Sequence, residues 1–332
     1  PPRKAKEDIR TPNAPRPQHL IYRIFVNLMT LGFSLRMAKR KSGITQGNQV
    51  SKRSDIIFHN GNILIKHCKH GYFAYNQYDD FVSRSLEVYG EWCDQELDFF
   101  NEMLNEGDVV LDVGAYIGTH AVFFAKKVGA LGKVHAFEPQ RSSFQMLCTN
   151  LTLNALYNTH CYQVGVSDKS TTIKLPVVDP YEGMNYGAIA IDDYLQGEDL
   201  QLITIDSLNL KQCNLIKVDV EGMEAKVLKG ARQTIKELRP VLYVENNNTD
   251  KSSEILQILL DLKYDCWWHF VPYFNPENFF KSKENIFITY KRSFEANLVC
   301  FPKEQNEKPD LLIRITDIKD NWIKAGARLN LK

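Results

Sequence analysis

Three charged side chains alternate with apolar ones in the segment NLIKVDVEG, residues 214–222. Side chains two positions apart project to the same face of a strand, so Lys217, Asp219 and Glu221 are expected to lie together. Charges among Leu, Ile and Val are costly to bury unless they pair or reach a site. We therefore interpret Lys217 and Asp219 as catalytic residues and Glu221 as a substrate-binding residue. A Lys–carboxylate pair that caps the sheet edge is the structural alternative.

A glycine-containing loop separates a strand from a helix in VVLDVGAYIGTH, residues 109–120. The apolar run at its start does not alternate, as expected for a strand that is covered on both faces. Glycine in such a turn lets the backbone approach a ligand and leaves the N–H groups of the helix N-terminus pointing at it. The pattern predicts a nucleoside site that contains Asp112, Gly114, Ala115, Tyr116 and Gly118.

A second strand, KVHAF, is followed by Glu138, where such folds place a carboxylate that accepts hydrogen bonds from a ribose diol. The loop lacks the G-x-G-x-x-G pattern of dinucleotide sites. Asp112 ahead of it would repel a pyrophosphate but suits the amino-acid part and the sulfonium of S-adenosyl-L-methionine. We predict S-adenosyl-L-methionine as the cofactor, with Val166 and Ser167 beside the adenine and Asp219 beside the methyl donor.

Strands and helices alternate along most of the chain. Strands are expected at 109–113, 133–137, 160–166, 214–220 and 240–245, and helices at 119–128, 142–154, 223–237 and 252–262. This alternation predicts an α/β fold with a mainly parallel, doubly wound, Rossmann-like sheet. Turn signals at Asn60-Gly61 and His70-Gly71 predict a small antiparallel β region before it. Residues 168–212 are expected to form a β-rich insertion.

The motifs LDVGAYIGTHAVFFAKK, GKVHAFEPQ, IKVDVEGMEAKVLKGA and RPVLYVENN resemble the FkbM-type family of S-adenosylmethionine-dependent O-methyltransferases, over about residues 86–300. The glycine loop and HAFEP occur in many class I methyltransferases, whereas KVDVEGME followed by VLKG is a narrower signature. The resemblance implies the class I methyltransferase fold. It also implies methyl transfer to a hydroxyl group, often of a sugar in a polysaccharide, glycolipid or secondary metabolite. The acceptor itself does not follow from the family.

An aromatic segment with amide side chains, WWHFVPYFNPENFF, begins at Trp267. Apolar ring faces stack on sugars while amides bond their hydroxyls, so the segment predicts a carbohydrate site with Trp268, His269, Asn275 and Asn278. A hydrophobic cover whose asparagines form turns is the alternative. A general base would accelerate the reaction by about 10²–10⁴-fold. The candidates for that base are Glu245, His269 and Asp219.

Two further functions use the same charged residues. Asp219, Glu221 and Glu245 stand at neighbouring strand ends, where carboxylates can hold magnesium, but no ligand spacing indicates a metal and we expect none to be required. Lys217 and Asp219 match part of the Lys-Asp-Lys-Glu arrangement of RNA ribose 2′-O-methyltransferases, although no second lysine is evident on the later strands. A non-catalytic S-adenosylmethionine-binding module of a larger glycan-synthesis protein is another alternative.

Composition bears on partners and compartment. The 332 residues include 41 basic and 40 acidic side chains, a net charge of +1, so no nucleic-acid partner is expected. The seven cysteines never show C-x-x-C spacing, which indicates neither a disulfide framework nor a zinc site. We expect a cytoplasmic protein with a saccharide or glycan acceptor.

The chain divides into four expected regions. These are a Pro-rich basic linker at 1–19, a helix plus the small β region at 20–85, the FkbM-type methyltransferase domain at 86–302, and an extension at 303–332. Because no initiator Met precedes the linker, the chain is expected to be part of a longer polypeptide. Residues 20–41 join an apolar stretch to a basic end, which predicts a helix that packs on its neighbour or lies on the inner face of a membrane.

Overall fold

The computed structural model describes residues 56–189, 194–290, 292–307, 309 and 312–328. Apart from Pro309, all of these residues belong to one compact unit. The expected helix within residues 20–41 lies outside the described residues. Among the helices that are described, none is long and apolar enough to cross a membrane.

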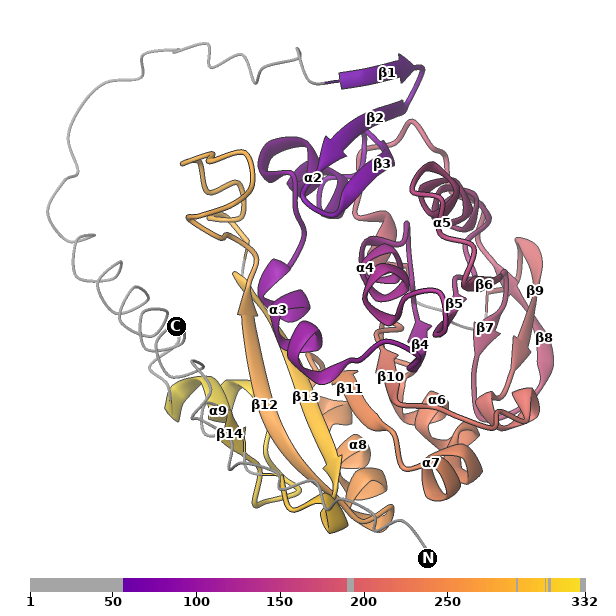
Figure 1. Ribbon diagram of the computed structural model, residues 1–332, viewed down its shortest axis with the longest axis vertical. Helices are drawn as coiled ribbons and strands as arrows, with labels where there is room; N and C mark the ends of the chain where they lie inside the picture. Colours follow the sequence, from indigo (N-terminus) through magenta and orange to yellow (C-terminus); the bar gives the residue numbers. More distant parts are fainter. Residues whose placement is uncertain (1–55, 190–193, 291, 308, 310–311, 329–332) are drawn as a thin grey trace, which may run out of the picture. The chain divides into compact units, whose positions relative to one another are not determined.

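An eight-stranded sheet with the order β14-β12-β13-β11-β10-β4-β5-β6 runs through this unit (Figure 1). The strands β6, β5, β4, β10 and β11 pair in parallel, and β13 is antiparallel to both β11 and β12. The bounds are β4 Val109–Val113, β5 Lys133–Phe137, β6 Thr159–Tyr162, β10 Leu215–Val218, β11 Val241–Glu245, β12 Tyr264–Pro272, β13 Phe294–Pro302 and β14 Ile313–Arg314. The mainly parallel, doubly wound sheet expected from the sequence is confirmed.

Helices cover both faces of this sheet (Figure 1). One face carries α3 (Asp94–Met103), α4 (Thr119–Val128) and α5 (Arg141–Leu153), and the other carries α6 (Glu224–Gly230), α7 (Arg232–Leu238) and α8 (Thr249–Asp261). Because both faces are covered, all five residues of β4 are buried, which accounts for its apolar run without alternation. Two further helices are α2 (Val82–Tyr89), which the sequence did not indicate, and α9 (Trp322–Arg328).

Two small sheets flank the main one. The antiparallel β1 (Ile56–Asn60), β2 (Ile63–Cys68) and β3 (Gly71–Asn76) confirm both expected turns, since Asn60 pairs with Ile63 and Cys68 with Gly71. Asn150 of α5 fixes β3, because its Oδ1 accepts the Ala74 N–H at 2.6 Å and its Nδ2 donates to the Ala74 carbonyl at 3.0 Å. The β-rich insertion contains β7 (Gly165–Val166), β8 (Thr171–Leu175) and β9 (Glu198–Ile203).

Three expected elements have different bounds. The strand expected at 160–166 is split between β6 in the main sheet and β7 in the insertion. The strand expected at 214–220 ends at Val218, because Glu221 (φ 52°) and Gly222 (φ 95°) turn the chain away from the sheet. The helix expected at 223–237 is two helices that meet at Ala231. Asp219 and Glu221 therefore lie beyond a strand end rather than on a strand.

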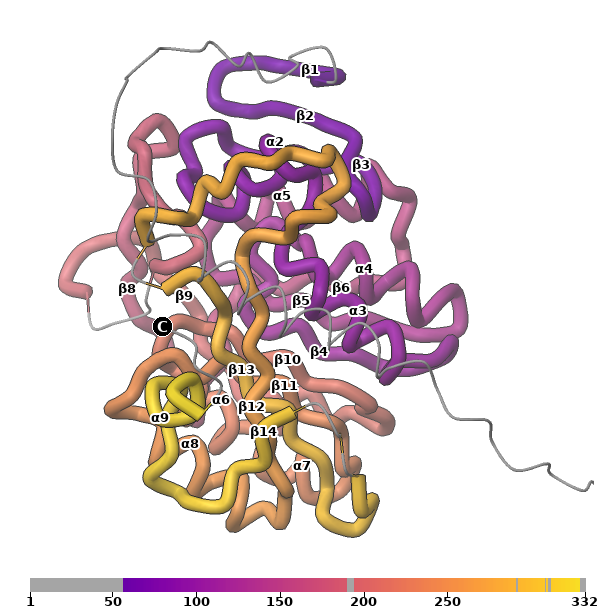
Figure 2. The backbone as a smooth tube through the Cα atoms, turned by 90° about the vertical axis from the view of Figure 1, so that its left-hand side faces the viewer, coloured from indigo at the N-terminus to yellow at the C-terminus, as the bar shows by residue number. Residues whose placement is uncertain are grey.

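The segment between β12 and β13 reaches across to α2, as the orange tube in Figure 2 shows. The Phe280 N–H donates to the Tyr89 carbonyl at 3.0 Å, and the Tyr89 hydroxyl donates to the Glu284 carbonyl at 2.8 Å. Tyr89 also belongs to a small apolar cluster with Tyr273 and Phe287. These contacts bring two segments that are distant in sequence to the same end of the sheet.

Gly114 allows β4 and β10 to meet closely at their carboxyl ends. Its φ is 87°, and a Cβ at this position would stand 1.7 Å from the backbone oxygen of Asp219. The Asp219 N–H also donates to the Val113 carbonyl at 2.9 Å. Position 114 thus requires glycine both for its left-handed backbone and for the close approach of Asp219.

Gly114→Ala is expected to lower the free energy of unfolding by more than the roughly 1–3 kcal/mol of a strained backbone alone, because the Asp219 segment must also move. Gly107→Ala is the matched control, since Gly107 has φ 90° but a Cβ there would meet nothing within 4 Å. Denaturant unfolding of both variants measures the difference. Equal losses would show that the close approach of Asp219 has no energetic weight.

Candidate functional site

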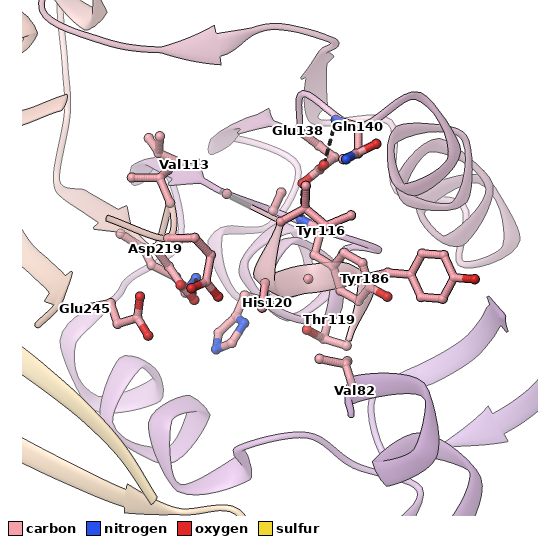
Figure 3. A pocket seen from close by; sticks show the side chains of 18 of the residues that line it. Val82, Val113, Tyr116, Thr119, His120, Glu138, Gln140, Tyr186, Asp219 and Glu245 are labelled. Carbon is pink, nitrogen blue, oxygen red and sulfur yellow. Dashed lines mark hydrogen bonds and ion pairs between the residues drawn. The ribbon is translucent and has the colours of Figure 1, made fainter. Parts of the chain in front are cut away.

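A pocket opens at the carboxyl ends of β4, β5, β10 and β11, the edge at which open α/β sheets bind ligands. Of the cofactor residues expected from the sequence, Gly114, Ala115, Tyr116, Glu138, Val166 and Asp219 line it. Lys217, Glu221 and Glu245 line it as well. Figure 3 shows Glu138 and Asp219 projecting from opposite sides of the glycine loop.

Backbone N–H groups hold the Glu138 carboxyl in place. Its Oε2 accepts the Tyr116 N–H and its Oε1 accepts the Gln140 N–H, each at 2.9 Å. Tyr116 donates from a left-handed conformation with φ 49°, a strain that is common at functional sites. Burial raises the pKa of Glu138 to about 7, although the two backbone donors oppose this shift. Glu138 is thus oriented to accept hydroxyl donors and changes its charge near neutral pH.

Three of the expected cofactor residues lie outside the pocket lining. Asp112 is fully buried beneath the loop, with its Oδ1 3.7 Å from the Lys217 Nζ. Gly118 serves packing, since a Cβ there would stand 2.7 Å from Leu147. The Ser167 hydroxyl donates to Asp168 at 3.1 Å. Asp112 and Gly118 therefore support the loop from its buried side, away from the pocket.

Lys217 is a buried cation between two carboxylates. Its side chain is 3% exposed, and its Nζ donates to the Asp219 Oδ2 at 3.0 Å. Burial opposes the charge of Lys217, but Asp219, Asp112 and Glu96 raise its pKa above the ordinary value. Burial would likewise raise the pKa of Asp219, but the Lys217 charge and hydrogen bond lower it. The Asp219 side chain remains 40% exposed, so the ionised carboxylate faces the pocket.

Carboxyl groups gather beside Asp219. Ligand oxygens of Asp219, Glu221 and Glu245 all lie within 4.8 Å of one another, so the three could hold a metal ion geometrically. Burial and then the charge of Asp219 raise the pKa of Glu221 to about 8, and the same two causes raise that of Glu245 well above its ordinary value. In the pocket without a ligand, burial and the charge of Asp219 therefore favour the protonated forms of Glu221 and Glu245.

Of the five residues expected to bind the acceptor, Glu221 lines the pocket and the other four lie outside its lining. Trp268 is 1% exposed, and its Nε1 donates to Asp320 at 3.3 Å. The His269 Nδ1 lies 3.0 Å from the Tyr243 hydroxyl, and burial lowers the pKa of His269 to about 4. Asn275 donates to Glu91 at 2.7 Å, and Asn278 is fully buried within its own turn. Trp268 and His269 are buried in β12, and the two asparagines bond within or beside the segment that follows it. The acceptor roles expected for these four residues, and that of His269 as a base, therefore find no support in this pocket.

Five more side chains line the pocket near α2 and the β12–β13 segment. They are Tyr273, from the aromatic segment noted in the sequence, and four residues that the sequence did not indicate, Phe81, Trp92, Arg292 and Glu295. The rings of Trp92 and Tyr273 stack with their centroids 5.7 Å apart and an interplanar angle of 16°. An Arg292 amine donates to the Tyr273 hydroxyl at 3.3 Å and lies 3.5 Å from Glu295. Since tertiary contacts alone bring these residues together, no spacing in the sequence signals them.

One missed residue stands next to a recognised motif. His120 follows the glycine loop directly, and it is the single histidine among the described residues that line the pocket. Its Nε2 lies 2.8 Å from Glu96 of α3. The position of His120, at the start of a helix that opens on a ligand site, was the signal available in the sequence.

Residues 112–266 match the family described as the methyltransferase FkbM domain. The hexuronic acid methyltransferase AglP of Haloferax volcanii is 29% identical over 167 residues. That alignment covers 49% of this chain and 65% of the relative, so the chain spans slightly less than two thirds of the relative's length. Residues 112–266 thus carry a methyltransferase FkbM domain, and the mainly parallel α/β sheet around it is the fold that the sequence predicted.

Solved structures with similar folds include the methyltransferase FkbM of Methylobacillus flagellatus KT, at 17% identity and a TM-score of 0.38. The similarity covers 67% of this chain and 55% of that protein. Trm5b of Pyrococcus abyssi has 14% identity and a TM-score of 0.42, over 74% of this chain and 56% of that protein.

The affinity for S-adenosylmethionine is expected to rise between pH 6 and pH 8. Below its pKa of about 7 Glu138 is mostly protonated, and above it the carboxylate accepts two ribose hydroxyl donors. Calorimetry across this range should show the affinity rising by about tenfold, which corresponds to a change of roughly 1.4 kcal/mol in the binding free energy. Glu138→Gln should bind weakly at every pH and lose the dependence. A wild-type affinity that falls with pH would contradict the assignment.

Turnover is expected to survive removal of divalent metal, because protons already compensate two of the three clustered carboxyl groups. Dialysis against EDTA should leave the rate within about twofold of that of untreated protein. Loss of a required Lewis-acid metal would remove several kcal/mol of transition-state stabilisation and slow the reaction far more. Added Mg²⁺ that restored more than tenfold activity would contradict this. Glu221→Gln, which removes one candidate ligand while preserving side-chain volume, should show the same ratio of rates with and without EDTA as the wild type.

Proposed function

We propose that this chain, which carries a methyltransferase FkbM domain over residues 112–266, transfers a methyl group from S-adenosyl-L-methionine to a hydroxyl group of a saccharide. The observation that carries the proposal is a single pocket with two chemically different ends. One end has the glycine loop and Glu138, and the other has an aromatic wall beside Asp219.

The donor end suits a cationic amino-acid nucleoside. Glu138 would accept the ribose hydroxyls, while the loop from Gly114 to Tyr116 would pass against the amino-acid part and Val166 beside the adenine. Asp219 would steady the sulfonium, because its carboxylate is kept ionised by Lys217 at 3.0 Å. A dinucleotide pyrophosphate would be repelled by the same carboxylate.

The acceptor end suits a sugar ring. Stacked Trp92 and Tyr273 offer apolar faces, and Glu221, Glu245 and Glu295 offer oxygens that accept hydrogen bonds from hydroxyls. Arg292 adds the cation that a sugar carboxylate would require, and its Nε is buried without a hydrogen-bond partner. The relative named for hexuronic acid supports a saccharide acceptor, and a hexuronic acid is the first acceptor to test.

The RNA ribose alternative finds less support in this pocket. Its Lys-Asp-Lys-Glu arrangement requires a second lysine, but the ends of β11 and β13 supply Glu245 and Glu295. A net charge of +1 also disfavours a groove for a polyanion. We further propose a cytoplasmic location, consistent with the seven free cysteines.

Labelled S-adenosylmethionine incubated with separate pools of acidic oligosaccharides, neutral oligosaccharides, RNA and small phenols is expected to label saccharides alone. Retention of label after mild alkali distinguishes an ether at a hydroxyl from an ester at a carboxylate. Labelling of RNA at low salt but not at high salt would favour the ribose alternative, because binding to a phosphate backbone weakens as salt is added. Binding of S-adenosylmethionine without label in any pool would favour the non-catalytic module.

Trp92→Ala is expected to raise KM for the saccharide roughly three- to tenfold, because an aromatic stack contributes about 0.5–1.5 kcal/mol beyond its buried area. The affinity for S-adenosylmethionine should stay within twofold, since Trp92 lies at the acceptor end. Tyr157→Ala is the control, as Tyr157 is 81% exposed and lies outside the pocket lining. If the variant lost cofactor binding but kept its KM for the saccharide, Trp92 would lie at the donor end, contrary to the proposal.

A further inference from the structure

We propose that His120 is the general base for the acceptor hydroxyl and that Glu96 is its positioning residue. The inference rests on the proposed function and deepens it, because it assigns the proton transfer that methylation of a hydroxyl requires. The other candidates are less suited. His269 lies outside the pocket lining, and Asp219 is held by Lys217. Burial, and then the neighbouring carboxylates, raise the pKa of Glu245 well above its ordinary value, which disfavours the ionised form that a base requires.

A buried hydrogen-bond chain fixes the imidazole. The His120 Nε2 lies 2.8 Å from the Glu96 Oε2, and the other Glu96 oxygen accepts the Asn297 Nδ2–H at 2.7 Å. Glu96 and Asn297 are 3% and 4% exposed, respectively. The ring is also enclosed by Phe100 and Phe124, at centroid distances of 6.2 and 6.1 Å. Three separate elements, α3, α4 and β13, thus converge on one side chain.

The carboxylate selects the useful tautomer. When Glu96 is ionised, the neutral imidazole beside it keeps its proton on the bonded nitrogen, so Nε2 donates to Glu96 and Nδ1 remains a lone-pair acceptor. Figure 3 shows the His120 ring between Asp219 and Thr119, on the pocket side of the glycine loop. Nδ1 is therefore the nitrogen left to receive a proton from a bound hydroxyl.

The surrounding charges favour the same assignment. Burial, and then the positive charge of Lys217, lower the pKa of His120 to about 3, so the ring is neutral and able to accept at neutral pH. Asp112 and Asp219 act in the opposite direction, and His70 adds to the lowering. Glu96 also faces the ring, and burial raises the pKa of Glu96 to about 7. The ionised form of Glu96 that selects the useful tautomer therefore prevails above about pH 7.

The reaction conserves charge around this residue. The hydroxyl oxygen forms a bond to the methyl carbon, the carbon–sulfur bond breaks, and its electron pair returns to sulfur. The hydroxyl proton passes to the His120 Nδ1. The positive charge therefore moves from the sulfonium to the imidazolium, where Glu96 and Asp219 stabilise it. No other reactant is required, and the weak basicity of the resting ring is offset as the sulfonium loses its charge.

Kinetics with labelled S-adenosylmethionine and the saccharide pool test the assignment. His120→Gln retains a donor for Glu96 but has no basic nitrogen, so kcat should fall about 10²–10⁴-fold while cofactor affinity stays within threefold. His135→Gln is the control. His135 is also a partly buried histidine, bonded to the Tyr162 hydroxyl at 3.0 Å outside the pocket lining, and its kcat should not change. Added imidazole should partly restore His120→Ala.

Glu96→Gln tests the positioning role. An amide that donates to Nε2 would drive the imidazole proton to Nδ1, so kcat should fall and the ¹⁵N chemical shifts should report the opposite tautomer. The wild-type protein bound to S-adenosylhomocysteine should show a proton on Nε2 alone.

Two results would overturn the inference alone: a wild-type proton on Nδ1, or a His120→Gln kcat within threefold of wild type. A wild-type protein that labels no saccharide would overturn the proposed function as well.

Discussion

A single buried ammonium group determines the geometry of the site. The Lys217 side chain is only 3% exposed, and its charge is tolerated because Asp219 and Asp112 stand 3.0 and 3.7 Å away. Breaking a buried pair costs several kcal/mol, since the remaining charge stays uncompensated. This constraint fixes β10 against β4 at their carboxyl ends. It also holds the backbone of Asp219 so close to Gly114 that position 114 has no room for a Cβ.

Hydrogen bonds also attach the glycine loop to the end of β5. The Gly114 and Ala115 N–H groups donate to the Phe137 carbonyl at 3.0 and 2.9 Å, which ties β4 to β5. Tyr116 then donates to Glu138 just beyond β5. Two strand ends and one loop are thus connected through backbone groups and a single side chain, that of Glu138. Backbone connections tolerate many side-chain changes. The residues at the acceptor end of the pocket take no part in these connections. They can therefore differ between proteins with different acceptors while the donor end stays the same.

The sequence indicated most of the donor end of the pocket but only part of the acceptor end, because the two ends are assembled differently along the chain. Gly114, Tyr116 and Glu138 lie on two consecutive strand–loop units, so short-range pattern places them together. Trp92, Tyr273 and Arg292 meet only after the β12–β13 segment has crossed to α2. The aromatic run from Trp267 to Phe270 was misread because composition alone does not separate a sugar platform from a buried strand. Its nine-residue strand β12 is buried at all but one position.

Charge compensation joins the two halves of the pocket. Glu138, Glu221 and Glu295 all have a raised pKa, with burial as the largest cause, so the pocket without ligand holds several carboxyl groups close to their protonation midpoint. A sulfonium that enters such a pocket replaces protons as the compensating charge. Binding of the cation and release of protons are therefore linked. A neighbouring imidazole that then gains a proton as the sulfonium becomes a neutral thioether restores the same balance, so His120 and the clustered carboxyl groups belong to one electrostatic unit.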